Sequence, residues 1–204
     1  MLRFKFILLL FAVIIFVSCN NDKKQEQNKK AVDSVIDNNN NIKTNTSNNT
    51  HNTNIKFIEP EKLAEFLPIS IPKAEKYPSN SGFQIWNDRK ISSASAEYVF
   101  KPGGIVIIIN DYGSYNNIPQ DDLLYIKKYS EQQVENIQKL ILPDGIGYQR
   151  WDDVAETGLL EALIFNRIII RIEGIRLQEK YQNLSDFYYF INTKNLQKEI
   201  NKLN

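Results

Sequence analysis

The chain has 204 residues, with 25 Lys and Arg against 24 Asp and Glu, so its formal net charge is only +1. Such a balance gives no basic face for nucleic acid, and we expect no nucleic-acid partner. The single cysteine excludes an internal disulfide, and the single histidine argues against a histidine-based catalytic centre or metal site.

The first residues have the pattern of an export signal. Arg3 and Lys5 give a positive start, and the uninterrupted apolar run Phe6–Val17 follows, ending at Ser18 and Cys19. A run of about 12 apolar residues is shorter than the roughly 20 that a membrane-spanning helix needs. A charged start, a short apolar core and a small residue at its end are typical of a secretory signal peptide.

The end of this run, Phe16-Val17-Ser18-Cys19, resembles the lipobox of bacterial lipoproteins. The resemblance implies that residues 1–18 are removed and that Cys19 is acylated, which makes membrane lipid a partner of the chain. Asn20, rather than aspartate, follows the cysteine, and by the family's sorting rule this favours the outer membrane over the inner membrane. An ordinary signal anchor and a simple cleaved signal are the alternatives.

Residues 19–54 are predicted to be the lipidated cysteine and a disordered tether. Twelve of the 35 residues from Asn20 to Asn54 are asparagine and none is aromatic, so this segment lacks the apolar surface needed to fold. A flexible chain of this length reaches roughly 30–35 Å. His51 lies in this segment, which leaves the remainder of the chain without a histidine.

Residues 55–204 are predicted to form a single domain, and its first half reads as one helix and three strands. The predicted elements are a short helix over Glu59–Phe66 and strands over Phe83–Trp86, Ile91–Lys101 and Ile105–Ile109. The last strand is a continuous β-branched run bounded by turn residues, which indicates a central strand buried on both faces.

The second half begins with the longest predicted helix, from Gln120 or Asp121 to about Ile141. A strand over Gly147–Asp152 follows, and then a hairpin of two strands over Leu159–Phe165 and Arg167–Glu173. The chain closes with a helix that begins near Asn183 or Leu184 and a second short helix over Asn195–Leu203. In the second arm of the hairpin, isoleucines alternate with Arg171 and Glu173, which predicts one buried face and one partly exposed face.

The element order predicts an α+β fold. We expect a mostly antiparallel sheet of about six strands, covered by the long central helix and the C-terminal helix on opposite faces, as an α/β/α sandwich. This order of elements resembles that of PsbP and Mog1 proteins. The resemblance implies an interaction fold without enzymatic activity.

A search for chemistry finds no CxxC, HExxH, GxSxG or phosphate-binding loop, and we therefore expect neither an enzyme nor a bound cofactor or metal. Three clusters at strand ends are candidate ligand or partner contacts because carboxylates beside aromatic rings bind sugars or cations. The alternative is that they are solvated strand ends, where Asn and Asp favour turns. The candidates are Trp86, Asp88, Asp111, Tyr112, Trp151 and Asp152.

Three functional hypotheses follow. The first is an envelope lipoprotein whose domain binds a protein partner or assists an assembly without catalysis. The second is a lipoprotein that binds a small glycan, lipid or peptide, which requires a concave and partly apolar pocket. The third is a hydrolase that uses Asp111 with Asp152 or Asp153, which requires two carboxylates within roughly 5–10 Å of each other.

Overall fold

The computed structural model describes residues 55–203, so the predictions for the signal peptide, Cys19 and the tether lie outside the described residues. Four α-helices are found in this range: α2 (Pro60–Ala64), α3 (Gln120–Glu131), α4 (Ser185–Tyr188) and α5 (Thr193–Leu203). The strands are β1 (Glu75–Lys76), β2 (Asn80–Trp86), β3 (Arg89–Val99), β4 (Gly104–Asp111), β5 (Ile137–Leu142), β6 (Gly145–Asp152), β7 (Thr157–Ile164) and β8 (Ile168–Ile175).

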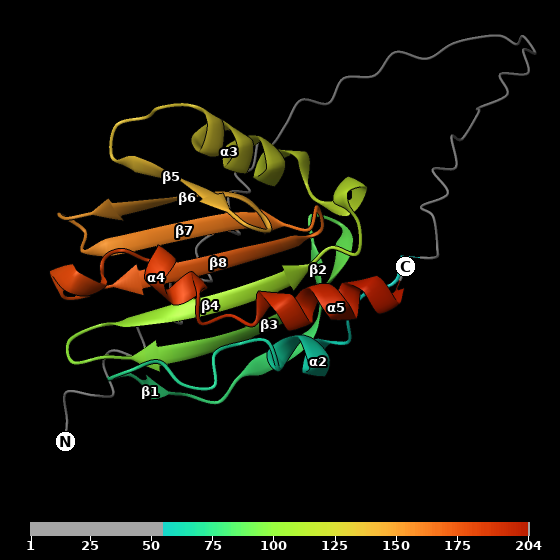
Figure 1. Cartoon of the computed structure of the whole chain (residues 1–204), viewed down its shortest axis with the longest axis horizontal. Coiled ribbons are helices and arrows are strands. Elements are labelled where there is room, and N and C mark those ends of the chain that lie inside the picture. The colour runs from blue at the N-terminus through green and yellow to red at the C-terminus, as the bar shows by residue number, and fades with distance from the viewer. Residues whose placement is uncertain (1–54, 204) are drawn as a thin grey trace, which may run out of the picture. The chain divides into compact units, whose positions relative to one another are not determined.

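These strands form one antiparallel sheet (Figure 1). The order is β1-β3-β4-β8-β7-β6-β5, and β2 pairs with β3 next to the short β1. The predicted α+β class and antiparallel sheet are confirmed. The predicted strand number was too low, because eight strands are present among the described residues and the sequence reading missed β1 and β5.

The missed strand β5 corresponds to the second half of the helix expected over residues 120–141. The helix α3 ends at Glu131, and Asn136 then takes a left-handed conformation with φ of 63° before β5 begins. Leu140 and Leu142 are buried, whereas the intervening Ile141 is 83% exposed. This alternation, together with pairing to β6, outweighs the helical spacing on which the prediction relied.

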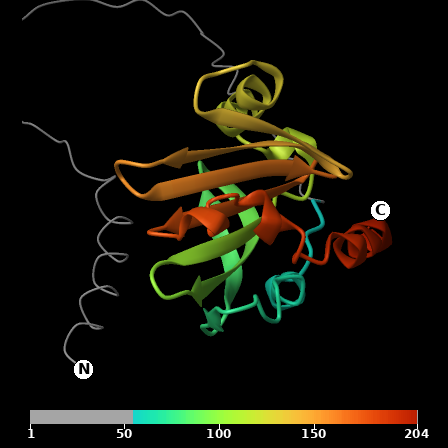
Figure 2. The same ribbon diagram turned by 60° about the vertical axis from the view of Figure 1, so that its left-hand side comes forward.

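Helices cover both faces of the sheet, as expected for an α/β/α sandwich (Figure 2). On one face, α2, α4 and α5 pack through Leu63, Phe187 and Leu196 onto the larger hydrophobic core. On the other face, α3 packs through Leu123 and Ile126 over β5, β6 and β7.

The central strand β4 is buried on one face only. Ile105, Ile107 and Ile109 are at most 1% exposed in the larger core, whereas Val106 and Ile108 on the other face are partly exposed. The expectation of burial on both faces was therefore wrong for this strand. The reason is the position of α3, which packs over β5, β6 and β7 and leaves this part of the sheet without a covering helix.

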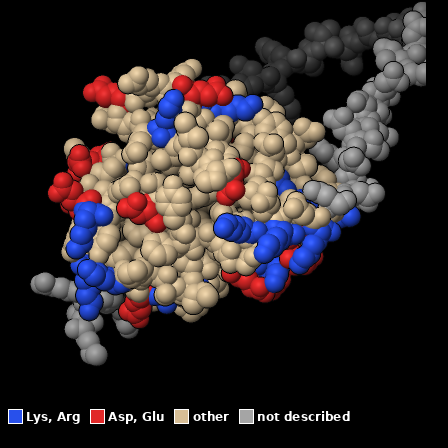
Figure 3. Space-filling model, viewed as in Figure 1, with Lys and Arg blue, Asp and Glu red and all other residues tan. Residues whose placement is uncertain are grey.

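The β7–β8 hairpin has the predicted alternation. Ile168, Ile170 and Ile172 are buried in the larger core, and Arg171 and Glu173 point to the face that carries α3. At the C-terminus the expected first helix is only the four-residue α4, and α5 is the longer element. None of the helices described in residues 55–203 is long and apolar enough to cross a membrane. Acidic and basic side chains are interspersed on the face that Figure 3 shows.

Candidate functional site

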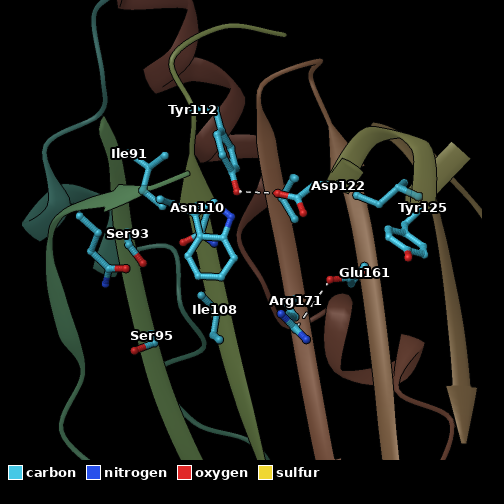
Figure 4. A pocket seen from close by; sticks show the side chains of 14 residues that line it. Ile91, Ser93, Ser95, Ile108, Asn110, Tyr112, Asp122, Tyr125, Glu161 and Arg171 are labelled. Carbon is cyan, nitrogen blue, oxygen red and sulfur yellow. Dashed lines mark hydrogen bonds and ion pairs between the residues drawn. The ribbon is translucent and has the colours of Figure 1, made fainter. Parts of the chain in front are cut away.

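A cleft of about 310 Å³ lies on the sheet face that carries α3 (Figure 4). Its floor comes from β3, β4, β7 and β8, and its sides come from β2 and α3. The lining residues are Gln84, Trp86, Ile91, Ser93, Ser95, Ile108, Asn110, Tyr112, Asp122, Tyr125, Ile126, Glu161, Ile169 and Arg171. The volume is at the lower end of the range for small-molecule sites.

Two features of the sequence create this cleft. Ser93 and Ser95 place small side chains on the floor, opposite Asn110 and Ile108 of the neighbouring strand. Trp86 on β2 and Tyr125 on α3 are 48% and 56% exposed, so each side of the cleft has a partly exposed aromatic ring. The space is therefore bounded by aromatic rings, and its floor carries both polar and isoleucine side chains.

The floor contains an unused hydrogen-bond acceptor. The Oδ1 atom of Asn110 is buried, and no donor among the described residues reaches it. A buried polar atom without a partner costs about 1–3 kcal/mol of stability. Such a cost at the floor of a cleft is explained if a bound molecule supplies the missing donor.

Arg171 is the only positively charged residue that lines the cleft. Its Nε atom lies 2.9 Å from Glu173 Oε1 and 3.7 Å from Glu161 Oε1, although the N–H is not aligned for a hydrogen bond with either. The Arg171 side chain is 41% exposed, so solvent screens these ion pairs. Its positive charge is shared between two carboxylates.

Asp122 is held at the first turn of α3, opposite Glu161. Burial raises the pKa of the Asp122 carboxyl, and the negative charge of Glu161 raises it further. The indole N–H of Trp86, the hydroxyl of Tyr112 and the charge of Arg171 act in the opposite direction. The Tyr112 hydroxyl donates to Asp122 Oδ2 over a long 3.5 Å, so this carboxylate is incompletely compensated.

Glu161 has a closer partner, because the Tyr148 hydroxyl donates a hydrogen bond to its Oε2 atom. Burial, followed by this hydrogen bond, raises the pKa of Tyr148, and burial followed by Asp122 raises that of Tyr112. Both phenols therefore stay protonated at neutral pH and act as donors to the two carboxylates.

Among the residues predicted from sequence, Trp86 and Tyr112 line the cleft, but Asp111 does not. The Asp111 side chain is fully buried and pairs with Arg167, whose Nε and Nη2 atoms donate to it at 2.8 and 2.7 Å. The backbone N–H groups of Ile58 and Gly113 donate to the same carboxylate, each at 2.8 Å. Asp111 thus ties the beginning of the domain to β4 and β8, and it is unavailable to a ligand.

The remaining candidates lie elsewhere. Asp152 ends β6, where its Oδ1 accepts from the backbone N–H groups of Val154 and Ala155 and closes a turn. Trp151 packs against the larger core. Asp88 lies in the β2–β3 turn with a left-handed φ of 60°. These three residues lie at strand ends and turns, as the alternative to ligand contact predicts.

The strand register separates the carboxylates of the hydrolase hypothesis. Asp111 lies at the end of the sheet where β6 begins with Gly145, as the pairs through Ile168 and Ile164 show. Asp152 lies seven residues further along β6, which is about 23 Å at 3.3 Å per residue. The structure does not bring Asp111 and Asp152 to one cleft.

Sequence reasoning missed Asp122, Glu161 and Arg171 as site residues. One signal was available for Arg171, since the alternation of isoleucine with charge in β8 indicated an exposed position. Its cross-strand partner Glu161 was not identifiable, because the register of β7 against β8 brings these residues opposite each other. Within residues 55–203, no group of three or more His, Cys, Asp or Glu side chains is placed to hold a metal ion.

Comparisons with known proteins identify no relative. No protein-family model matches the chain, and no curated protein matches it. Among solved structures, a GTP-binding regulator from Thermotoga maritima is similar over 59% of this chain and 76% of that chain, with a TM-score of 0.35 and 8% sequence identity. This level of similarity does not establish a shared fold or function.

Proposed function

We propose that this chain is a lipid-anchored binding protein of the bacterial cell envelope, whose domain holds a small ligand in the cleft between β2 and α3. The observation that carries the proposal is the unpartnered Oδ1 atom of Asn110 on the floor of a partly apolar cleft. A concave apolar site with a few convergent polar groups is the usual form of a small-molecule site. This is the second of the three hypotheses, and the cleft is what favours it.

The chemistry of the cleft supports binding without catalysis. Asp122 and Glu161 each accept a hydrogen bond from a tyrosine whose pKa is raised, so these phenols are donors rather than bases. The tyrosine partners instead hold the two carboxylates in fixed positions.

The anchoring part of the proposal rests on the sequence of residues 1–19. It is tested by growing cells with an alkyne analogue of palmitate and comparing the native chain with the Cys19→Ala variant. We expect label on the native chain and none on the variant. Equal labelling of both, or label on neither, would exclude acylation at Cys19.

The binding part is tested with tryptophan as a reporter, because the chain has only Trp86 and Trp151. In the Trp151→Phe variant all tryptophan emission comes from Trp86 at the side of the cleft. A library of small glycans, amphiphiles and short peptides is screened against the full lipidated chain in nanodiscs. A ligand should shift the emission of this variant and leave that of the Trp86→Phe variant unchanged.

Isotope-edited NMR of the same sample then locates the site. Chemical-shift changes confined to the residues of the cleft support the proposal. Shifts on the α2–α5 face, or no saturable shifts with any library member, would contradict it. In the fluorescence screen, the Trp86→Phe variant serves as the matched control, since its one remaining tryptophan, Trp151, packs against the larger core.

A protein partner is a second candidate, and strand β2 favours it. No strand among the described residues pairs with the outer edge of β2, and its segment Asn80–Trp86 contains neither charge nor proline. Natural edge strands are normally protected by such residues. Phe83 and Ile85 are also 42% and 72% exposed, which suits pairing with a strand of another protein.

This candidate is tested by placing a photo-reactive amino acid at Ile85 in cells. Val154 is the matched control, because it is an apolar side chain that is 97% exposed at the far end of the sheet. A discrete adduct at Ile85, absent at Val154 and identified by mass spectrometry, would support a partner strand. Equal adducts at both positions would argue against it.

A further inference from the structure

Two acceptors that line the cleft lack a good donor. Asn110 Oδ1 is buried without a partner, and the Asp122 carboxylate has only a long hydrogen bond from Tyr112 in addition to its contact with Trp86. The principal donor group on the floor, the Arg171 guanidinium, is drawn to Glu161 and Glu173. A molecule that completes these two contacts therefore supplies hydrogen-bond donors to them.

The charged side chains that line the cleft carry a net negative charge, which also favours a ligand that donates hydrogen bonds. Two carboxylates, Asp122 and Glu161, face one guanidinium, and Arg171 lies closer to Glu173, outside the lining, than to Glu161. The lysines of the flanking elements are directed elsewhere: Lys90 lies 3.9 Å from the centroid of the Phe83 ring, and Lys127 lies 5.5 Å from that of Tyr115. A net negative charge thus remains in a partly desolvated site.

The sides of the cleft suit a cation as well. Trp86 and Tyr125 each present a partly exposed ring, and the face of an aromatic ring attracts a cation. Burial, followed by the charge of Glu161, raises the pKa of Asp122, and a cation bound beside this carboxylate would lower it. Between the rings and the carboxylates, apolar surface from Ile91, Ile108 and Ile169 can accept an aliphatic stem.

Resting on the proposed function, we infer that the ligand of this cleft carries a primary ammonium group on a short aliphatic stem. The ammonium donates to Asp122 and to Asn110 Oδ1, and the stem packs on the isoleucines of the floor. A primary ammonium has three donors and no acceptor, which matches the unused acceptors. A neutral saccharide would leave the negative charge uncompensated.

The inference is tested by titrating the Trp151→Phe full chain with five probes and following Trp86 emission. Three share a five-carbon stem and differ at the head group: n-pentylamine, 1-pentanol and hexanoate. The fourth, N,N,N-trimethylpentylammonium, keeps the charge and removes the donors, and the fifth is maltose. We expect n-pentylamine to bind at least tenfold more tightly than each of the others, and to weaken as salt is raised.

Two substitutions assign the effect to the cleft. Asp122→Asn should weaken n-pentylamine binding at least tenfold, whereas Asp153→Asn, in the exposed turn at the far end of the sheet, should leave it unchanged. If Asp122→Asn unfolds the domain, Glu161→Gln gives the same comparison. Circular dichroism verifies the fold of each variant.

The outcomes separate the inference from the proposed function. If 1-pentanol or maltose binds as tightly as n-pentylamine, the ammonium inference is wrong, and ligand binding in the cleft stands. If no probe changes Trp86 emission, the ammonium inference is also wrong, and the library screen with NMR decides the proposed function independently. Loss of n-pentylamine binding in Asp122→Asn but not in Asp153→Asn supports the inference.

Discussion

Replacement of Arg167 by methionine should destabilise the domain strongly. The Asp111 side chain is fully buried, the Arg167 side chain is 6% exposed, and two of the four hydrogen bonds to the carboxylate come from Arg167. Methionine fills a similar volume but leaves a buried negative charge with two backbone donors. Removal of one partner of a buried ion pair costs about 3–5 kcal/mol.

That cost is a large part of the total stability, since domains are typically stable by about 5–15 kcal/mol. For a domain of this size, 1 kcal/mol corresponds to about 2–4 °C in Tm, so we expect Arg167→Met to lower Tm by about 6–20 °C. Urea unfolding followed by circular dichroism and tryptophan fluorescence measures the free energy. Arg150→Met is the control, because Arg150 is exposed on β6 and its replacement should change stability by no more than about 0.5 kcal/mol.

A double-mutant cycle with Asp111→Asn isolates the pair. The double variant should be more stable than the sum of the single effects predicts, by about 2 kcal/mol or more, because it contains no isolated buried charge. It should not regain native stability, since the N–H groups of Ile58 and Gly113 lose a charged acceptor. A loss below about 1 kcal/mol for Arg167→Met, or strict additivity in the cycle, would refute this reasoning.

Three further predictions concern burial and the cleft. Gly145→Ala should lower the free energy of urea unfolding by about 1–3 kcal/mol, because a Cβ atom there would lie 1.9 Å from the Leu163 carbonyl oxygen. Gly82 has open space around it, so Gly82→Ala should be neutral or stabilising, and equal effects of the two substitutions would contradict this geometry. Asn110→Leu should stabilise the domain by about 1 kcal/mol, by removing an unpartnered buried acceptor, and should abolish n-pentylamine binding; a loss of stability would show that the acceptor is satisfied. In an alkaline titration followed at 295 nm, four of the ten tyrosines should resist ionisation until the domain unfolds, because burial raises their pKa, and stability should fall as the pH rises above about 10; ionisation of all ten in one step before unfolding would contradict this. The four are Tyr98, Tyr112, Tyr148 and Tyr188.

The parts of the fold that were predictable are those where local pattern and tertiary role agree. The apolar alternation of β8 and the glycine turn before β4 give the strands that the structure contains. The segment 132–142 was misassigned because its apolar spacing fits both a helix and a strand. Pairing of β5 with β6 decides between them, and that pairing is a tertiary interaction.

The site was less predictable than the fold, for a related reason. Asp111 had the sequence context of a solvated strand end, and only the arginine 56 residues later makes it a buried anchor. Conversely, Asp122, Glu161 and Arg171 lie on three separate elements and look like ordinary surface residues in sequence. The register of β7 against β8 and the packing of α3 bring them together, and a local motif encodes neither.

The cleft exists because the two faces of the sheet are covered unequally. The larger core fills the face beneath α2, α4 and α5, and stability of the domain depends mainly on that face. On the other face, α3 is only 12 residues long and packs over β5, β6 and β7, so Ser93, Asn110 and Arg171 on the neighbouring strands have no helix above them. The buried Oδ1 atom of Asn110 therefore lies on a part of the sheet that no helix covers and has no donor among the described residues, and the proposed binding function rests on this feature.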